Sequence, residues 1–206
     1  MTPRQARSLR TQESILDALE RLLNADPYGE LSMPGIAEAA GVSVGGLYGR
    51  FANREQLMDA VHARYQARRD KMLLEKLDAQ GETGLSERIG AFVDAFVDLH
   101  SRNAGVLRSF IIRHWLTGGA PTHEVLAEVR DHKQRVVDYL LAACPDDERG
   151  SRAGRIRRAV EYVISISKDQ IVVAPDKPAE RTALDLEQLR ADLRLIANRM
   201  IFGRDP

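Results

Sequence analysis

Apolar residues recur every three or four positions along most of the chain, and charged residues fill the positions between them. This spacing places the apolar residues on one face of an α-helix. The first such face consists of Ile15, Leu16, Leu19, Leu22 and Leu23. The same pattern predicts further helices over residues 54–77, 89–100, 106–115, 125–140, 151–172 and 186–201.

Strands are not predicted, because no segment alternates apolar and polar residues as a half-buried strand does. The β-branched residues of 164–173 would also suit a strand, which leaves this segment open between the two structures. Glycines or prolines interrupt the helical pattern at residues 26–29, 80–84 and 174–178. The pattern therefore predicts an all-α protein of about nine helices, with a compact unit up to about residue 68 followed by a larger bundle.

Two short helices are predicted between the first helix and the one that begins near residue 54. Ser32 and Ser43 precede them and are suited to be N-caps, because a serine oxygen accepts a hydrogen bond from a free backbone N–H of the first turn. Gly41 provides the sharp turn between the helices, where a side chain would cause strain. Small apolar residues would hold the two helices together: Ile36, Ala37, Ala40, Val42 and Leu47. This is the pattern of a helix-turn-helix that lies in the major groove of DNA.

The charge of the chain does not favour general electrostatic binding to DNA. It has 30 Lys and Arg against 30 Asp and Glu, so DNA affinity must depend on where the charges lie. The single cysteine, Cys144, cannot form an internal disulfide, which is typical of a reducing cytoplasm. The first residues lack an apolar signal core, and no run approaches the roughly 18 apolar residues of a membrane span. We therefore expect a cytoplasmic protein that does not contact a membrane.

The segment from Ser32 to Phe51 resembles the tetracycline-repressor (TetR) family of transcriptional regulators. That family has the pattern Thr/Ser-x-x-x-Ile-Ala-x-x-Ala-Gly-Val-Ser-x-Gly-x-Leu-Tyr-x-x-Phe, followed by a polar link and an acidic helix start. The matching residues are Ser32, Ile36, Ala37, Ala40, Gly41, Val42, Ser43, Gly45, Leu47, Tyr48 and Phe51, followed by Asn53-Arg54-Glu55-Gln56-Leu57. The resemblance covers about residues 8–68.

The resemblance implies a helix-turn-helix DNA-binding domain over residues 8–68 and an effector-binding and dimerisation domain over residues 69–206. It also implies a homodimer, most often a repressor, on a palindromic site in double-stranded DNA. A small molecule bound in the helical bundle would shift the helix over 54–77 and change the spacing of the two reading helices. Such a ligand acts through its different affinity for the two states.

By the same resemblance, Ser32, Tyr48 and Arg54 contact phosphates, and the helix after Ser43 reads bases. The chain departs from the family at Val44 and Gly46, which replace the usual Lys and Thr. Few side chains remain for base edges, so we expect specificity to depend partly on DNA shape. The arginines at positions 4, 7 and 10 form an N-terminal arm suited to phosphate or the minor groove. The complete expected set is Arg4, Arg7, Arg10, Ser32, Ser43, Val44, Gly45, Gly46, Tyr48, Arg50, Asn53 and Arg54.

Aromatic and histidine residues on apolar helix faces are either ordinary core or the wall of an effector cavity. The pattern does not separate the two. The expected effector-binding residues are Phe92, Phe96, His100, Phe110, His114, Trp115 and Tyr139. In the family the last two helices pair with those of a second copy, and the apolar residues expected at that interface are Ile156, Val160, Val163, Ile164, Leu189, Leu193, Ile196 and Met200.

Four other interpretations of the sequence compete with this one. Gly41-Val42-Ser43-Val44-Gly45 formally matches the G-x-S-x-G nucleophile elbow, but that motif follows a strand and none is predicted here, so we expect no catalytic residues and no enzyme. The five histidines lack metal-ligand spacing, so neither a metal site nor a cofactor is predicted. Cys144 has no basic residue next to it in the sequence that would lower the pKa of its thiol, so a redox-sensor role is not predicted. The glycine-rich second helix leaves open a ligand-binding or interaction module with a degenerate helix-turn-helix.

Overall fold

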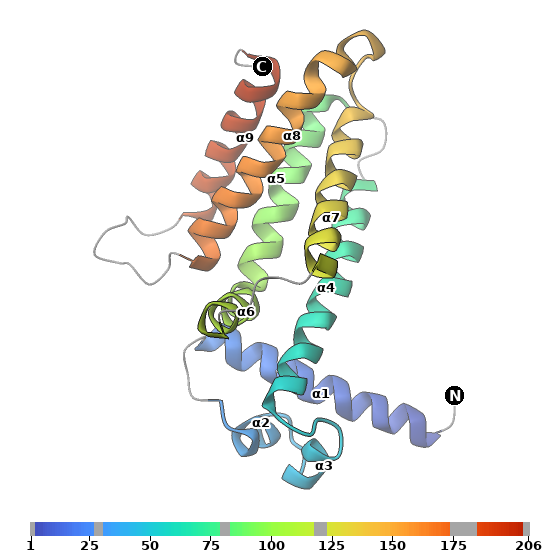
Figure 1. Cartoon of the computed structure of the whole chain (residues 1–206), viewed down its shortest axis with the longest axis vertical. Coiled ribbons are helices and arrows are strands. Elements are labelled where there is room, and N and C mark those ends of the chain that lie inside the picture. Colours follow the sequence, from blue (N-terminus) through green and yellow to red (C-terminus); the bar gives the residue numbers. More distant parts are fainter. Residues whose placement is uncertain (1–2, 27–30, 79–82, 118–122, 174–184, 204–206) are drawn as a thin grey trace, which may run out of the picture. The chain divides into compact units, whose positions relative to one another are not determined.

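The computed structural model describes residues 3–26, 31–78, 83–117, 123–173 and 185–203, and every regular element in them is a helix (Figure 1). The prediction of an all-α fold is therefore confirmed. The elements are α1 (Pro3–Ala25), α2 (Met33–Ala39), α3 (Val44–Tyr48), α4 (Arg54–Asp78), α5 (Leu85–Arg102), α6 (Ala104–Thr117), α7 (His123–Leu141), α8 (Asp146–Lys168), the π-helix η1 (Asp169–Val173) and α9 (Leu186–Phe202). None of these described helices combines the length and the apolar composition of a membrane span.

The helices form two compact units. Unit 1 comprises residues 1–68 and 103–117, and unit 2 comprises residues 69–102 and 118–206. The long helix α4 contributes residues to both units. Residues 104–117 were expected within the C-terminal domain of 69–206, whereas α6 packs against α1 in unit 1. The sequences of α1 and α6 contain no feature that predicts that these two helices pack together.

The core of unit 1 forms where α1 meets the short helices and the start of α4. The apolar face predicted for α1 is buried, except that Leu22 is half-buried. The buried apolar residues of unit 1 are Ile15, Leu16, Ala18, Leu19, Leu23, Met33, Ile36, Ala37, Leu47, Phe51, Leu57, Val61, Tyr65 and Val106. These contacts fix the two short helices, which would be too short to be stable alone.

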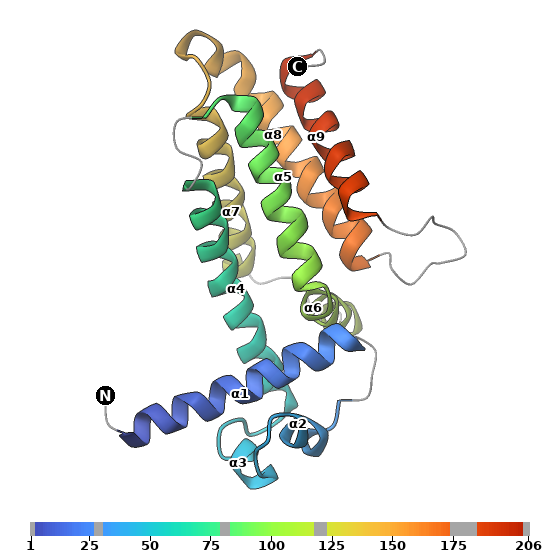
Figure 2. The same cartoon turned by 180° about the vertical axis from the view of Figure 1, so that it is seen from behind.

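In unit 2, α5 lies between α7 on one side and α8 and α9 on the other (Figure 2). It packs against α7, α8, α9 and η1. Its buried residues lie on more than one face, as expected for an inner helix: Leu85, Ile89, Phe92, Val93, Ala95, Phe96, Val97, Leu99 and His100. The surrounding helices therefore use their apolar faces to cover α5.

The structure revises two helix starts and decides the one segment that was left open. The N-terminal arm is helical, because α1 already begins at Pro3. Helix α8 begins at Asp146, five residues before the predicted start, where Asp146, Asp147 and Glu148 in its first turn suit the positive end of the helix dipole. The segment 164–173 is helical and ends in a π-turn, so the alternative of a strand is wrong. Residues 27–30, 79–82, 118–122 and 174–184 lie outside the described residues, and these ranges contain most of the predicted breaks at 26–29, 80–84 and 174–178.

Candidate nucleic-acid interface

Both short helices begin with the predicted serine cap. Ser32 has an extended backbone, and its Oγ accepts a hydrogen bond from the N–H of Gly35 at 3.1 Å. Ser43 caps α3 in the same way by accepting from the N–H of Gly46 at 3.0 Å. Each hydroxyl keeps its own hydrogen, which can be donated to an acceptor such as a phosphate oxygen.

The turn between α2 and α3 requires glycine at position 41. Gly41 has a φ of +66°, a left-handed conformation that a side chain disfavours by about 1–2 kcal/mol. A Cβ at this position would meet nothing within 4 Å, so the requirement is conformational and not steric. The N–H groups of Gly41 and Val42 donate to the carbonyls of Glu38 and Ala37, both at 3.0 Å. This closed turn fixes the direction of α3.

The outer face of α3 carries almost no polar side chains. Leu47 is fully buried in unit 1, whereas Val44 and Tyr48 are 41% and 48% exposed. Gly45 is exposed, and a Cβ there would meet nothing within 4 Å. The face consists of an isopropyl group, a phenol and bare backbone. It can approach another surface closely and offers the Tyr48 hydroxyl as its polar group.

Two predicted DNA-binding residues make contacts within the chain. The Nη1 of Arg50 donates to the carbonyl of Gly46 at 2.8 Å, so its guanidinium lies on α3 itself. Asn53 Oδ1 accepts from the N–H of Gln56 at 2.9 Å, and Gln56 Oε1 accepts from the N–H of Ala52 at 3.0 Å. This reciprocal pair starts α4 much as a capping box does.

Three of the predicted DNA-binding arginines are exposed in the part of the chain that the structure describes. Arg54 lies exposed in the first turn of α4. Arg7 and Arg10 are exposed on the first turns of α1, and Arg10 Nε donates to the carbonyl of Ala6 at 3.4 Å. The side chain of Arg4 lies outside the described residues.

A buried arginine that was missed from the sequence joins α4 to α1. The side chain of Arg64 is 9% exposed, and its guanidinium bonds Glu13 at 3.0 Å, Asp17 at 2.8 Å and Glu20 at 2.7 Å. Burial alone would lower the pKa of Arg64, but hydrogen bonds and charges from Glu20, Glu13 and Asp17 raise it overall. We call this group the α1–α4 brace. Acidic residues spaced by three or four on α1 could have indicated it.

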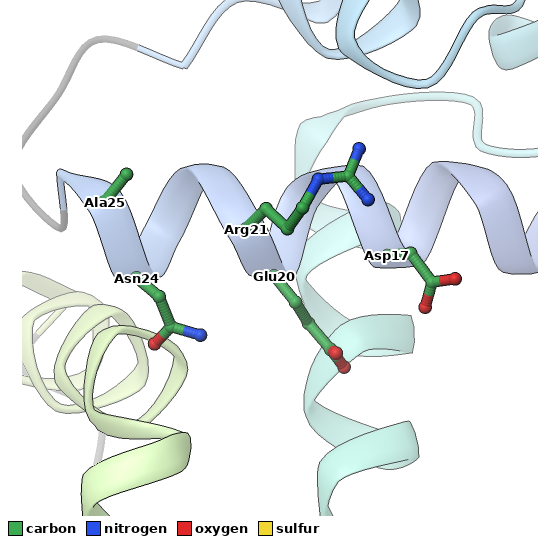
Figure 3. Close-up of a pocket in the computed structure, with 5 residues that line it drawn as sticks. All are labelled: Asp17, Glu20, Arg21, Asn24 and Ala25. Atoms are coloured by element: carbon green, nitrogen blue, oxygen red, sulfur yellow. The ribbon is translucent and has the colours of Figure 1, made fainter.

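The opposite side of α1 holds α2. Figure 3 shows Arg21 pointing away from Glu20 and Asn24, in an open pocket that Asp17 and Ala25 also line. Arg21 Nη2 donates to the carbonyl of Ala39, at the end of α2, at 3.2 Å. On α1, Arg21 therefore contacts α2, and the preceding residue Glu20 contacts α4.

Three predicted effector-binding residues come together inside unit 2. Phe92, Phe96 and His100 follow one another along α5, with centroids 5.0 Å apart for the first pair and 5.9 Å for the second. His100 Nδ1 lies 2.9 Å from Ser167 Oγ. Burial lowers the pKa of His100 to about 4, with smaller contributions from the charges of Lys168 and His132, so the imidazole is neutral at pH 7. Sequence reasoning missed Ser167, a small polar residue on an apolar face.

Two other predicted effector-binding residues, Phe110 and Tyr139, make different contacts. Phe110 belongs to unit 1, where its ring stacks on His62 at 3.7 Å. Tyr139 lies beneath the Arg88 guanidinium at 4.8 Å. The side chains of His114 and Trp115 lie outside the described residues.

Most of the predicted dimer residues are core residues of a single chain. Ile156, Val160, Val163, Leu189 and Leu193 are buried within unit 2, and Ile164, Ile196 and Met200 are half-buried. The exposed apolar side chains of the same helices are Tyr162, 51% exposed on α8, and Leu195, 46% exposed on α9. Sequence reasoning missed both.

The residues behind the other hypotheses have structural roles. Ser43 follows a helix and a turn, and its Oγ caps α3. Burial raises the pKa of the Cys144 thiol, against the charges of Arg152 and Arg149, and Sγ lies 3.8 Å from the carbonyl of Leu140. Among the described residues, no group of three His, Cys, Asp or Glu side chains could hold a metal ion.

Comparison with known proteins gives one family match. Residues 15–61 match the model of the bacterial regulatory proteins of the tetR family. No curated protein matches the chain.

Solved structures with the same fold extend the likeness over most of the chain. A TetR family transcription regulator from Marinobacter aquaeolei VT8 is 17% identical with a TM-score of 0.59, and the match covers 94% of this chain and 97% of that one. A TetR-like transcriptional regulator from Rhodococcus sp. RHA1 is 18% identical with a TM-score of 0.55, over 99% and 100% of the two chains. A putative TetR family regulator from Vibrio parahaemolyticus is 16% identical with a TM-score of 0.50, over 89% and 96%. At these identities the likeness concerns the fold.

Proposed function

Because this chain belongs to the tetR family of bacterial regulatory proteins through its N-terminal part, we propose that it is a ligand-responsive repressor that binds a palindromic operator as a homodimer. The observation that carries the proposal is the pair of serine-capped helices with an exposed, nearly side-chain-free face on α3. Such a face fits the floor of a major groove. A regulator of this kind acts in the cytoplasm, where its operator is.

On DNA, the backbone of α3 at Gly45 approaches the bases while side chains around it contact phosphates. Tyr48 donates its hydroxyl, Arg54 contributes a charge, and the Ser32 and Ser43 hydroxyls can each donate a hydrogen bond. Val44 reaches a thymine methyl group. With so few base contacts, groove width and the ease of bending contribute a large share of the specificity.

The effector site that we propose lies at Phe92, Phe96, His100 and Ser167. The neutral His100–Ser167 pair supplies hydrogen-bonding groups within aromatic surroundings, which is the usual composition of a small-molecule site. Helix α4 transmits the change, because it is the described helix that belongs to both units. The ligand shifts the population between a DNA-binding and a released state by its difference in affinity for them.

Selection of bound sequences from a random DNA pool tests the proposal as a whole. We expect enrichment of a twofold-symmetric site whose half-sites lie about 34–36 Å apart or a multiple of that distance. A pool that stays random after repeated rounds would favour the alternative of a helical interaction module with a degenerate helix-turn-helix.

Replacing Arg54 with glutamine should weaken binding to the selected site about tenfold, because one exposed cation no longer contacts a phosphate. The loss should be nearly the same for matched and mismatched sequences. The slope of log K against log salt should fall by about one. Fluorescence anisotropy at several salt concentrations measures both quantities. The exposed Arg158→Gln of α8 is the control that should leave affinity and slope unchanged; equal effects of both variants would remove Arg54 from the interface.

A homodimer would use the exposed apolar side chains of α8 and α9. Leu195→Asp and Tyr162→Asp should each raise the dimer dissociation constant about 30-fold, a hot-spot cost of about 2 kcal/mol, because a charge is then buried at the interface. Analytical ultracentrifugation over a dilution series measures the constant. Val44→Asp, which also adds a charge at an exposed apolar residue, should not change it. Unchanged dimers in both α8 and α9 variants would place the interface elsewhere.

A further inference from the structure

A groove between α7 and α8 has the size and lining of a small-molecule site. Its volume is about 330 Å³, at the lower end of the roughly 300–1,000 Å³ typical of ligand pockets. The two helices pack side by side in unit 2 (Figure 1). The lining residues are Val129, Arg130, Lys133, Gln134 and Val137 of α7 with Arg157, Val160 and Glu161 of α8.

The floor of the groove is apolar. Val137 and Val160 are 3% and 1% exposed, so they form a closed base, and Val129 is exposed at the edge. Valine side chains there can cover an alkyl chain but cannot bind a polar group. The floor therefore favours a ligand with an apolar part.

The rim of the groove is basic. Among the lining residues that the structure describes, Arg130, Lys133 and Arg157 are cations and Glu161 is the anion, so these residues carry a net charge of +2. Lys133 Nζ bonds both oxygens of Glu161, at 2.9 and 2.7 Å. Within the described residues, neither Arg130 nor Arg157 forms a hydrogen bond or an ion pair, and both are exposed. Two guanidinium groups at one rim are thus available to a bound anion.

We propose that this α7–α8 groove binds a small organic anion with an apolar chain. The anionic head lies between Arg130 and Arg157, which can each donate two parallel hydrogen bonds to a carboxylate or phosphate. The chain lies over Val129, Val137 and Val160. This site is separate from the His100–Ser167 cluster, and its occupation does not depend on DNA binding.

Isothermal titration calorimetry of the full chain with octanoate tests the proposal. We expect saturable one-site binding, with octanol and acetate at least tenfold weaker because each lacks one half of the ligand. Arg157→Gln and Arg130→Gln should each weaken octanoate at least tenfold. Arg158→Gln, next to Arg157 on the same helix and outside the groove lining, should leave it unchanged.

Other results would overturn the proposal. If octanoate binds the Arg157→Gln variant as it binds the parent chain, its site lies elsewhere, for example in the core of unit 2. If hexaglutamate binds and octanoate does not, the groove accepts an acidic protein segment. If Arg157→Gln changes the sedimentation of the free protein, the groove is a contact between copies. These measurements contain no DNA, so they test the groove independently of the proposed regulator. If the protein failed to bind DNA, the proposed function would be wrong, but the octanoate result would be unaffected.

Discussion

Alanine in place of Gly105 should destabilise unit 1 by about 3 kcal/mol, although alanine is the better helix former. Gly105 lies at the start of α6, where a Cβ would stand 2.1 Å from the carbonyl oxygen of Leu23 and 2.6 Å from the Cα of Asn24. These are backbone atoms, so no side-chain rotation can relieve the overlap. The N–H of Gly105 also donates to Asn24 Oδ1 at 2.8 Å, which holds the two backbones at this distance. Separation of α1 from α6 would therefore lose both packing and a hydrogen bond.

Urea unfolding followed by circular dichroism measures the loss. The matched control is Gly150→Ala in α8, where a Cβ would meet nothing within 4 Å and helix propensity should stabilise the chain by up to about 1 kcal/mol. Opposite signs for the two substitutions are expected. A Gly105→Ala variant as stable as its parent would show that α1 and α6 separate without cost.

Removing the charge of Arg64 should cost unit 1 about 2–3 kcal/mol. Arg64→Met keeps a long apolar stem but leaves Glu13, Asp17 and Glu20 close together without their buried cation, so that they are compensated only in part by the half-exposed Arg68 beside Glu20 and Asp17. Breaking a buried ion pair from one side is costly because the remaining charges lose their compensation. The value lies below that of a fully buried pair because Glu13 and Asp17 are half exposed. For the same reason, 1 M salt should reduce the loss by screening the carboxylates.

Arg68→Met provides the comparison. Arg68 also bonds Glu20, at 3.0 Å, but its side chain is 50% exposed. Surface pairs of this kind contribute about 0–1 kcal/mol, so thermal or urea unfolding of this variant should stay close to the parent chain. A similar loss in both variants would mean that burial does not distinguish the two arginines.

The helix-turn-helix could be predicted from the sequence because its determinants are local. The hydroxyls of Ser32 and Ser43 bond N–H groups only three residues away, and Gly41 adopts its left-handed turn without help from distant residues. The periodicity that predicted the helices is local in the same sense. Such features depend on residues that are close in the sequence, so they can be predicted without knowing the fold.

The contacts that hold these helices in place could not be predicted in this way. Arg64 bonds carboxylates 44–51 residues away, and Gly105 bonds a side chain 81 residues away. The dimer residues show a second limit. Val163 and Leu195 are both apolar and lie on neighbouring helices, yet one is fully buried and the other exposed. The hydrophobicity of a residue indicates that its side chain tends to be buried. It does not indicate whether the side chain is buried by the same chain or by a second copy.

The outer face of α3 has a consequence for the DNA that such a protein could recognise. One isopropyl group, one phenol and exposed glycine backbone carry little chemical information about individual base pairs. Many operators of different sequence could then be occupied by one regulator, provided that their grooves narrow and widen at the same intervals. The operators of the genes under its control would then share a periodic variation in groove width. They would not share a well-defined consensus sequence.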